Sequence, residues 1–368
     1  MKKKVLFVAD SKLTFSEAPP SRFIYIAKSL KRKGLEVEII GRKGEKIEEL
    51  ETTQLGGAKH ISRFRILFYT YTGAIRHSYT AIIVRGELLA FLLLPLKILR
   101  TKLILDFHGW LYKEIETFYE KTIYSKLKAA FYCCAEKATV KYYNIIICNS
   151  QGFQRLLGQE EAKSIVLENG VDVKESEKAR CEAEREKEQI YEKYFIQKNK
   201  PLTCFLGNWH EYDDLQTMFR GAEIAETGTV VIGEGPGLNQ LKRAWSNVTF
   251  TGRLKRHEAL KVVQLCTIAI VPLRSIYYPT RKLKDYLSLA KPIIMTSVKG
   301  IEDYLIPNKN VLLYEPGNAE DLADKIKTLI SNKELANEMS QNNLALARRF
   351  DWQALVEKSG VIEKILKD

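Results

Sequence analysis

The sequence predicts an α/β protein with two doubly wound domains, each a parallel sheet covered by helices, which face each other across a cleft. Short apolar runs alternate with helical patterns along most of the chain, as is typical of parallel sheets. The length of 368 residues exceeds what one hydrophobic core usually serves. A highly charged segment in the middle of the chain separates two such alternating series, which indicates a domain boundary.

The first series occupies residues 1–172 and opens with an apolar strand. Its expected strands are 5–9, 36–40, 81–84, 102–107 and 145–148. Its expected helices are 22–33, 88–99 and 112–142. Strand and helix alternate in this order because a parallel neighbour needs a crossover connection.

Residues 173–199 are rich in Lys, Glu and Arg, so we expect a solvated linker helix there. The second series occupies 200–345, and 346–368 form a terminal amphipathic helix. The expected strands of the second series are 204–206, 229–232, 248–250, 268–272, 293–296 and 311–314. Its expected helices are 215–225, 238–245, 258–266, a short one ending before Pro292, and 319–331.

The formal net charge of +13 favours an anionic partner, either an acidic membrane surface or phosphorylated small molecules. The basic residues are scattered among acids without an arginine-rich or zinc-finger pattern, so no nucleic acid partner is expected. The six cysteines show neither a C-x-x-C pair nor metal-ligand spacing, which predicts no metal site and fits a reducing cytoplasm. The N-terminus has a basic start, but the apolar run that follows is too short for a signal peptide, so we expect a cytoplasmic protein.

Residues 278–297 combine a basic pair, a short helix and an apolar strand. The helix carries Lys282 and Asp285 three residues apart, hence on one face, and it ends before Pro292. At a helix N-terminus that points into a cleft, free N–H groups and the helix dipole favour a diphosphate. The carboxylate can accept hydrogen bonds from a ribose. The alternative is a salt-bridged surface helix.

Two other strand ends are candidates for ligand contacts. The run 230–237 empties into a glycine-rich turn at Gly233, where the backbone can approach a neighbour closely. This turn lacks the G-x-G-x-x-G spacing, so a nicotinamide cofactor is not favoured. His108 follows the strand 102–107 and precedes a glycine, and a purely structural histidine is the alternative there.

Together these motifs are specific. Nearly end to end, the chain resembles the GT-B glycosyltransferases of the family-4 type, the retaining group 1 transferases. The resemblance rests on CNS at 148–150, IVLENGVD at 165–172, IGEGP at 232–236, VTFTGRL at 248–254, the helix at 280–292 and FDW at 350–352. It implies two Rossmann-like domains, with the terminal helix 346–368 crossing back to the first domain.

The resemblance implies transfer of a sugar from a UDP- or GDP-linked donor to an acceptor hydroxyl with retention, without a metal ion or cofactor. It places Asp285 at the ribose, Lys282 near the diphosphate, and His108 beside the transferring sugar and the acceptor, and we take these three as the catalytic residues. The predicted donor-binding residues are Gly207, Asn208, Gly233, Gly252, Arg253, Leu254, Thr280, Arg281, Lys282 and Asp285.

The chain departs from the family pattern at two places. Tyr277 replaces the first glutamate of the motif, and the loop 207–214, which is basic in the family, has no Arg or Lys. Arg274, Arg281 and Lys282 are candidates for the missing positive charge. One alternative is therefore a catalytically degenerate sugar-nucleotide-binding or scaffold subunit. A nucleotide-sugar 2-epimerase on the same fold is another, although its sites demand more acidic and histidine residues in the cleft.

Basic residues alternate with Tyr and Phe at 63–71 and at 112–143, and Lys97 and Arg100 flank the apolar run 88–96. Such segments suit an anionic bilayer, so we expect a protein peripheral to the inner face of the membrane. Membrane contact implies a lipid-linked or glycolipid acceptor. Core aromatic residues beside a solvated basic face are the alternative.

Overall fold

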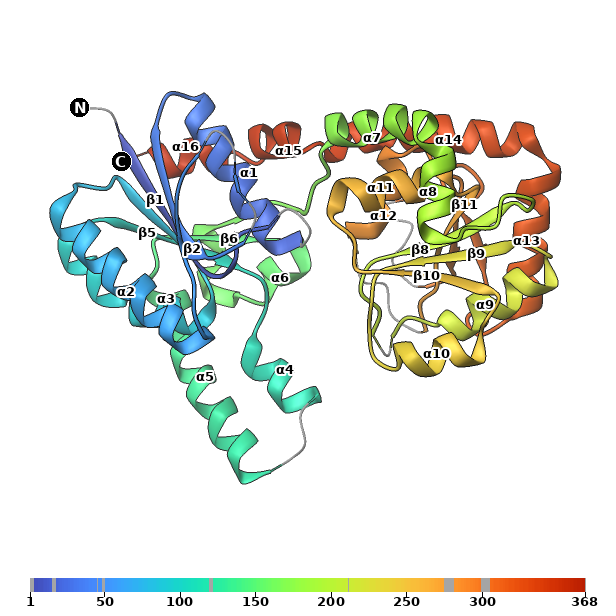
Figure 1. The fold of residues 1–368 in the computed structure, drawn as a ribbon. Helices are drawn as coiled ribbons and strands as arrows, with labels where there is room; N and C mark the ends of the chain where they lie inside the picture. The colour runs from blue at the N-terminus through green and yellow to red at the C-terminus, as the bar shows by residue number, and fades with distance from the viewer. Residues whose placement is uncertain are drawn as a thin grey trace. The chain divides into compact units, whose positions relative to one another are not determined.

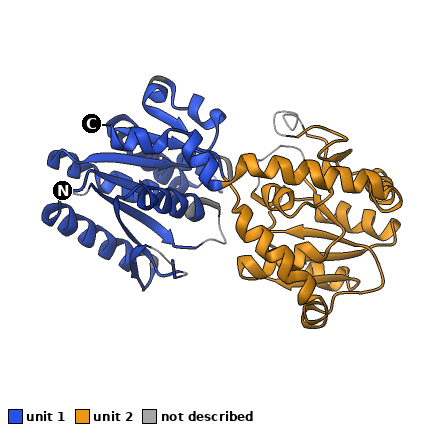
Figure 2. Cartoon of the chain, turned by 90° about the horizontal axis from the view of Figure 1, so that it is seen from above, with its two compact units in different colours: residues 1–169, 352–368 blue, residues 170–351 orange. Residues whose placement is uncertain are grey.

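The computed structural model describes residues 3–14, 18–44, 46–47, 50–118, 122–210, 212–274, 281–298 and 305–367. The chain divides into two compact units (Figure 2). The first unit comprises residues 1–169 and 352–368, and the second comprises residues 170–351.

The sheet of the first unit has seven parallel strands in the order β3-β2-β1-β4-β5-β6-β7. The strands are β1 (Lys4–Lys12), β2 (Glu36–Arg42), β3 (Glu51–Leu55), β4 (Ala81–Arg85), β5 (Lys102–Phe107), β6 (Ile145–Cys148) and β7 (Ser164–Val166). The strand order reverses once, between β1 and β4. At such a switch point the carboxyl ends of parallel strands leave room for a ligand.

Helices cover both faces of this sheet (Figure 1). The helical elements are α1 (Ala18–Arg32), α2 (Lys59–Arg76), α3 (Glu87–Leu92), η1 (Leu94–Leu99), α4 (Leu111–Phe118), α5 (Ile123–Tyr142), α6 (Gln151–Arg155), η2 (Gly158–Lys163), α15 (Trp352–Lys358) and α16 (Val361–Leu366). Successive residues of β1 point to opposite faces, as its period of two requires. Val5 and Phe7 pack with α1 and α16, whereas Leu6 and Val8 pack on the side of α2, α3 and α5.

The sheet of the second unit has six parallel strands in the order β10-β9-β8-β11-β12-β13. The strands are β8 (Leu202–Leu206), β9 (Gly228–Ile232), β10 (Val248–Gly252), β11 (Ile268–Val271), β12 (Ile293–Thr296) and β13 (Leu312–Tyr314). Its order reverses between β8 and β11. The predicted class, two parallel-sheet α/β domains, is confirmed.

Two helical layers also enclose the second sheet. The elements are α7 (Val173–Arg185), α8 (Lys187–Tyr194), α9 (Leu215–Ile224), α10 (Leu238–Ala244), α11 (Arg256–Leu265), α12 (Arg281–Ser288), α13 (Ala319–Ser331), α14 (Lys333–Ala347) and η4 (Arg348–Phe350). One layer contains α7, α8, α11 and α12, and the other contains α9, α10 and α13.

The charged segment 173–199, expected as a solvated linker helix, forms α7 and α8 within the second unit. Ala179 and Ala183, one helical turn apart, are fully buried, so α7 can approach α11 closely. A hydrogen bond between Glu182 and His257 (2.6 Å) and an ion pair between Glu186 and Lys261 (2.6 Å) join the polar faces of these helices. A segment poor in large apolar residues is thus held by small side chains and paired charges.

The terminal segment 346–368, expected as one helix, is divided at the unit boundary. Helices α15 and α16 both belong to the first unit, and Gly360, at φ 66°, lies between them. Trp352 is buried there, and its ring stacks on Tyr25 of α1 at 5.1 Å. Strand β3 and helices α2, α6 and α14 were not expected from the sequence.

The apolar run 88–96 belongs to the segment 88–99, which was expected as one helix, and it contains Pro95. The structure breaks it into α3 and the short 3-10 helix η1, with the proline in the first turn of η1. None of the helices within the described ranges has the length and apolar character needed to cross a membrane.

Candidate functional site

Three glycines at the ends of β8, β9 and β10 lie together in the second unit. The N–H of Gly233 donates to the carbonyl oxygen of Gly252 at 3.0 Å, and the N–H of Gly207 donates to that of Ile232 at 2.8 Å. A Cβ atom added to Gly233 would lie 2.2 Å from the carbonyl oxygen of Gly207. Any side chain at 233 would therefore push the two loops apart. The structure brings the predicted donor residues Gly207, Gly233 and Gly252 to one edge of the sheet.

Trp209 holds the loop after β8 against the turn after β9. Its ring is buried, and its Nε1–H donates to the carbonyl oxygen of Pro236 at 3.0 Å. A Cβ atom on Gly235 would lie 2.6 Å from the carbonyl oxygen of Trp209. The neighbouring Asn208, a predicted donor residue, is exposed. Sequence reasoning missed Trp209, although a tryptophan in a polar loop is a signal of burial.

Lys282, in the first turn of α12, reaches the loop that follows β8. Its ammonium lies 2.9 Å from Oδ1 of Asp213 and 3.8 Å from the centroid of the Phe205 ring. Its Cε is 3.8 Å from where a Cβ of Gly207 would be. Burial lowers the pKa of Lys282, and the Asp213 carboxylate opposes that shift. Lys282, predicted to contact the diphosphate, thus lies beside Gly207, but its ammonium is paired with the Asp213 carboxylate.

Asp285 is buried and held by an arginine that the sequence analysis did not select. Arg256 Nη1 and Nη2 donate to the two oxygens of Asp285 at 3.1 and 2.8 Å, and its Nε donates to Glu175 Oε2 at 2.7 Å. Burial disfavours the charge of Arg256, but Asp285 and then Glu175 raise the pKa of the guanidinium above its usual value. Two acceptor positions of Asp285 are therefore used within the protein.

These contacts also bear on the alternative that α12 is a salt-bridged surface helix. The side chains of Lys282 and Asp285 are both salt-bridged, but they are only 9% and 4% exposed, so they do not lie on the surface. The two residues do not pair with each other either. Arg281, on the same helix, has its Nε 4.0 Å from Oδ2 of Asp285.

The remaining predicted donor residues are more peripheral. Arg253 is half exposed, with Nη1 3.8 Å from Oε1 of Glu234. Leu254 packs on the core beneath α11. Thr280 and Tyr277 lie outside the described residues, so the structure does not place them.

In the first unit His108 sits at the end of β5 in a ring of charges. Its Nε2 lies 3.0 Å from Arg22 Nη2, 3.0 Å from Arg85 Nη1 and 3.0 Å from Asp106 Oδ2. Arg22 is fully buried, pairs with Asp106 and also donates to the carbonyl oxygen of Leu167 at 3.0 Å. The cluster joins β4, β5 and α1 at the edge of the sheet next to the switch point.

Burial, assisted by two guanidinium groups, keeps the His108 ring neutral. Burial lowers its pKa to about 4; Asp106 opposes this shift, whereas Arg22 and Arg85 add to it. For Asp106, burial raises the pKa, but Arg22, His108 and Arg85 together hold it well below its usual range. The guanidinium groups of Arg22 and Arg85 can only donate and so favour the tautomer in which Nε2 accepts. The Asp106 carboxylate can only accept and favours the tautomer in which Nε2–H donates.

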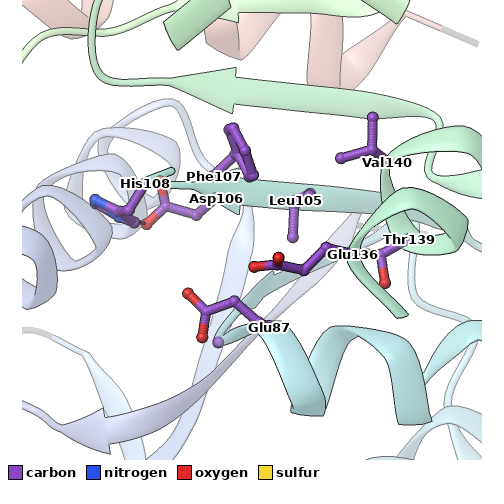
Figure 3. A pocket seen from close by; sticks show the side chains of 9 residues that line it. Glu87, Leu105, Asp106, Phe107, His108, Glu136, Thr139 and Val140 are labelled. Carbon is purple, nitrogen blue, oxygen red and sulfur yellow. Dashed lines mark hydrogen bonds and ion pairs between the residues drawn. The ribbon is translucent and has the colours of Figure 1, made fainter. Parts of the chain in front are cut away.

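A small pocket opens beside His108 (Figure 3). It is lined by Gly86, Glu87, Leu105, Asp106, Phe107, His108, Glu136, Thr139 and Val140. Glu136, although buried, accepts hydrogen bonds from the backbone N–H groups of Leu111 (2.8 Å) and Tyr112 (3.2 Å), and so caps α4. Within the described ranges, no group of three or more His, Cys, Asp and Glu is arranged to hold a metal ion.

Residues 186–345, most of the second unit, match the family of glycosyl transferases group 1. Over the whole chain, the structure is similar to that of the Anabaena HepE protein in complex with UDP-glucose. The TM-score is 0.71, with 15% identity, and the match covers 97% of this chain and 98% of HepE. The chain has the GT-B fold.

Two curated relatives are also similar in sequence. One is an uncharacterised glycosyltransferase of Methanocaldococcus jannaschii, 24% identical over 57% of this chain and 56% of that protein. The other is the N,N'-diacetylbacillosaminyl-diphospho-undecaprenol alpha-1,3-N-acetylgalactosaminyltransferase of Campylobacter jejuni, 24% identical over 56% of this chain and 55% of that protein. The matched region therefore spans a little more than half the length of these relatives.

Proposed function

We propose that the chain is a glycosyltransferase that moves a sugar from a UDP- or GDP-linked donor to an acceptor hydroxyl with retention. One observation carries this proposal: Gly207, Gly233 and Gly252 lie together with Lys282 at one edge of the second sheet. This sheet belongs to the unit that matches group 1 glycosyltransferases. Close glycine backbones and a buried ammonium form a site for an uncharged sugar linked to a diphosphate. The bound UDP-glucose named for HepE supports the same class of donor.

In this proposal the second unit stabilises the leaving diphosphate without a metal ion or a further cofactor. Lys282 and the N-terminal turn of α12 would face the charge that develops on the diphosphate. Asp285 stands one turn further along α12, where its remaining acceptor positions can hold the ribose hydroxyls. Arg256 fixes the orientation of that carboxylate through its two hydrogen bonds.

His108 would act in the first unit as a neutral hydrogen-bond donor. Because its pKa is lowered to about 4, the ring carries no charge near neutral pH. In the tautomer that accepts from Arg22 and Arg85 at Nε2, the Nδ1–H would be available to a sugar or acceptor oxygen.

We further propose that the acceptor is a lipid-linked or glycolipid glycan and that the protein docks peripherally on the inner face of the membrane. The apolar face comprises Ile61, Phe64, Phe68 and Ile75 of α2 and Ile123, Tyr124, Leu127 and Phe131 of α5, all of them exposed. Both helices pack against α3 on the same side of the sheet, and the ring centroids of Phe91 in α3 and Phe131 in α5 are 6.3 Å apart. The undecaprenol-linked substrate named for the Campylobacter relative supports such an acceptor.

The structure changes which cations would face the bilayer. Arg63, expected in that role, turns inward, and its Nε donates to Oδ2 of Asp10 at 2.6 Å. Arg65 and Arg100 are exposed beside the apolar face and Ile98. An exposed basic residue near an anionic surface contributes about 1 kcal/mol.

Sedimentation with liposomes tests the membrane proposal. We expect binding to phosphatidylglycerol vesicles at low salt and little binding to phosphatidylcholine vesicles, because charge attracts the protein before apolar side chains insert. The pair Phe64→Ser and Phe68→Ser should weaken binding at every salt concentration, whereas Arg65→Glu with Arg100→Glu should remove the salt-sensitive part. Recovery of the wild type with neither lipid would contradict membrane docking, and equal recovery with both would contradict the role of charge in it.

A thermal-shift screen tests the donor site. Ligands that bind only the folded state raise its melting temperature, so UDP, GDP or one of their sugar esters should stabilise the chain. Lys282→Met should weaken the best of these ligands by roughly ten- to a hundredfold, as expected for loss of a charge-assisted contact. Lys255→Met, the same change at an exposed position of the same unit, is the control. An unchanged affinity in Lys282→Met would place the nucleotide elsewhere.

A non-catalytic nucleotide-sugar-binding subunit is a second candidate function. Two observations favour it: Lys282 is already paired with Asp213, and Asp285 with Arg256. Such a subunit would pass the thermal-shift test but would neither transfer nor hydrolyse the sugar.

A further inference from the structure

Asp213 is an acidic residue at the place where the proposed donor needs positive charge. It belongs to the loop after β8, and its side chain is completely buried. Oδ1 accepts from the Lys282 ammonium at 2.9 Å, and Oδ2 accepts from the backbone N–H of His210 at 3.0 Å. A backbone bridge to Leu273, just after β11, fixes the other side of the residue. The carboxylate is therefore built into the switch point of the second sheet.

Lys282, the ion-pair partner of Asp213, is confined as well. The Lys282 ammonium lies over the Phe205 ring, and its stem runs beside Gly207. A diphosphate that reaches Lys282 over the Gly207 backbone must approach the Asp213 carboxylate too. The negative charges of the diphosphate and of the Asp213 carboxylate repel each other, and this repulsion is screened less at a buried position than at the surface.

We propose that Asp213 makes the site discriminate against the released nucleoside diphosphate in favour of the sugar-bearing donor. This inference rests on the proposed function. During transfer the acceptor oxygen bonds to the anomeric carbon, whose bond to the terminal phosphate oxygen breaks with the electron pair on that oxygen. The acceptor proton leaves to the phosphate or to water. The released diphosphate carries about one more negative charge than the donor near neutral pH. Asp213 repels it more strongly and so promotes its release.

Calorimetric titration of two ligand pairs tests the proposal: UDP with UDP-glucose, and GDP with GDP-mannose. The repulsion scales with ligand charge. Asp213→Asn should therefore lower the dissociation constant of the sugar-bearing donor by roughly tenfold and that of the diphosphate by roughly thirtyfold. The ratio of the two dissociation constants then changes about threefold. Asp214→Asn is the matched control, because Asp214 caps α9 through Thr217 (3.3 Å to its N–H) and makes no contact with Lys282 that the structure records.

The outcomes separate this inference from the proposed function. If Asp213→Asn binds both ligands of a pair with the wild-type ratio, Asp213 does not discriminate and the inference is wrong. If the wild type binds no nucleotide of either pair, the proposed function fails and the inference with it. Asp213→Ser, which replaces the carboxylate by a smaller uncharged hydroxyl group, provides a second variant and should shift the ratio in the same direction as Asp213→Asn.

Discussion

Replacement of Arg256 by Met is expected to destabilise the second unit by about 3–5 kcal/mol, because it leaves buried charges without their partner. The guanidinium makes both hydrogen bonds to Asp285, and its Nε donates to Glu175 at 2.7 Å. Asp285 is 3% exposed, so it cannot regain those bonds from water. Methionine fills a similar volume, so the loss reports the charge rather than a cavity.

Urea unfolding measures this loss, with Arg253→Met as the control. Arg253 is half exposed and 3.8 Å from Glu234, so its replacement should cost less than about 1 kcal/mol. The double variant Arg256→Met with Asp285→Leu should recover part of the stability, since no unpaired carboxylate then remains on α12. Equal stabilities of Arg256→Met and Arg253→Met would show that the buried pair does not hold α11 to α12.

The same contacts revise what is expected of Asp285→Ala. From sequence alone this change is expected to weaken nucleotide binding and abolish transfer without unfolding the protein. In the structure it also deprives Arg256 of two hydrogen bonds, leaving Glu175 as its recorded carboxylate partner. Loss of affinity in Asp285→Ala is therefore interpretable only beside its free energy of unfolding.

His108→Ala is expected to lower turnover by roughly a hundred- to a thousandfold, the usual effect of removing one hydrogen-bond donor at a reacting centre. Nucleotide affinity should stay near the wild-type value, because the proposed donor residues lie in the second unit. An interaction made only in the transition state appears in kcat rather than in ground-state binding.

Steady-state kinetics with His108→Asn and His77→Ala complete this experiment. Asparagine carries a neutral N–H group and should restore part of the rate, whereas a merely structural histidine would not show this rescue. His77, an exposed histidine of the same unit, should be dispensable. Wild-type turnover in His108→Ala would mean that His108 only stabilises the charge cluster with Arg22 and Asp106.

Most of the fold was predictable because its strands are local apolar runs. The buried strands β6 and β12 consist of four residues each, and only Thr296 of β12 is polar among them. Such runs between helical patterns indicate a parallel sheet. The edge strand β3, with the sequence ETTQL, was missed because one of its sides is not covered by another strand and its residues are mostly polar.

The site was predictable only where its residues are close in sequence or fixed by backbone geometry. Gly233 and the position of Lys282 on α12 belong to local patterns. The partners of the two charged residues are distant: Asp213 lies 69 residues from Lys282, and Arg256 lies 29 residues from Asp285. One signal was available in the first unit, since Asp106 interrupts the apolar strand LILDF, and a charge in a buried strand requires a partner.

Proton NMR of the donor sugar tests the central claim most directly. The chain is incubated with UDP-glucose or GDP-mannose, first alone and then with a short-chain alkyl glycoside as acceptor, and the anomeric signals are followed from the start. The account predicts that a glycoside or free sugar forms first with the anomeric configuration of the donor and that Lys282→Met slows its formation. A product of inverted configuration, or tight nucleotide binding with an anomeric signal that never changes, would contradict it.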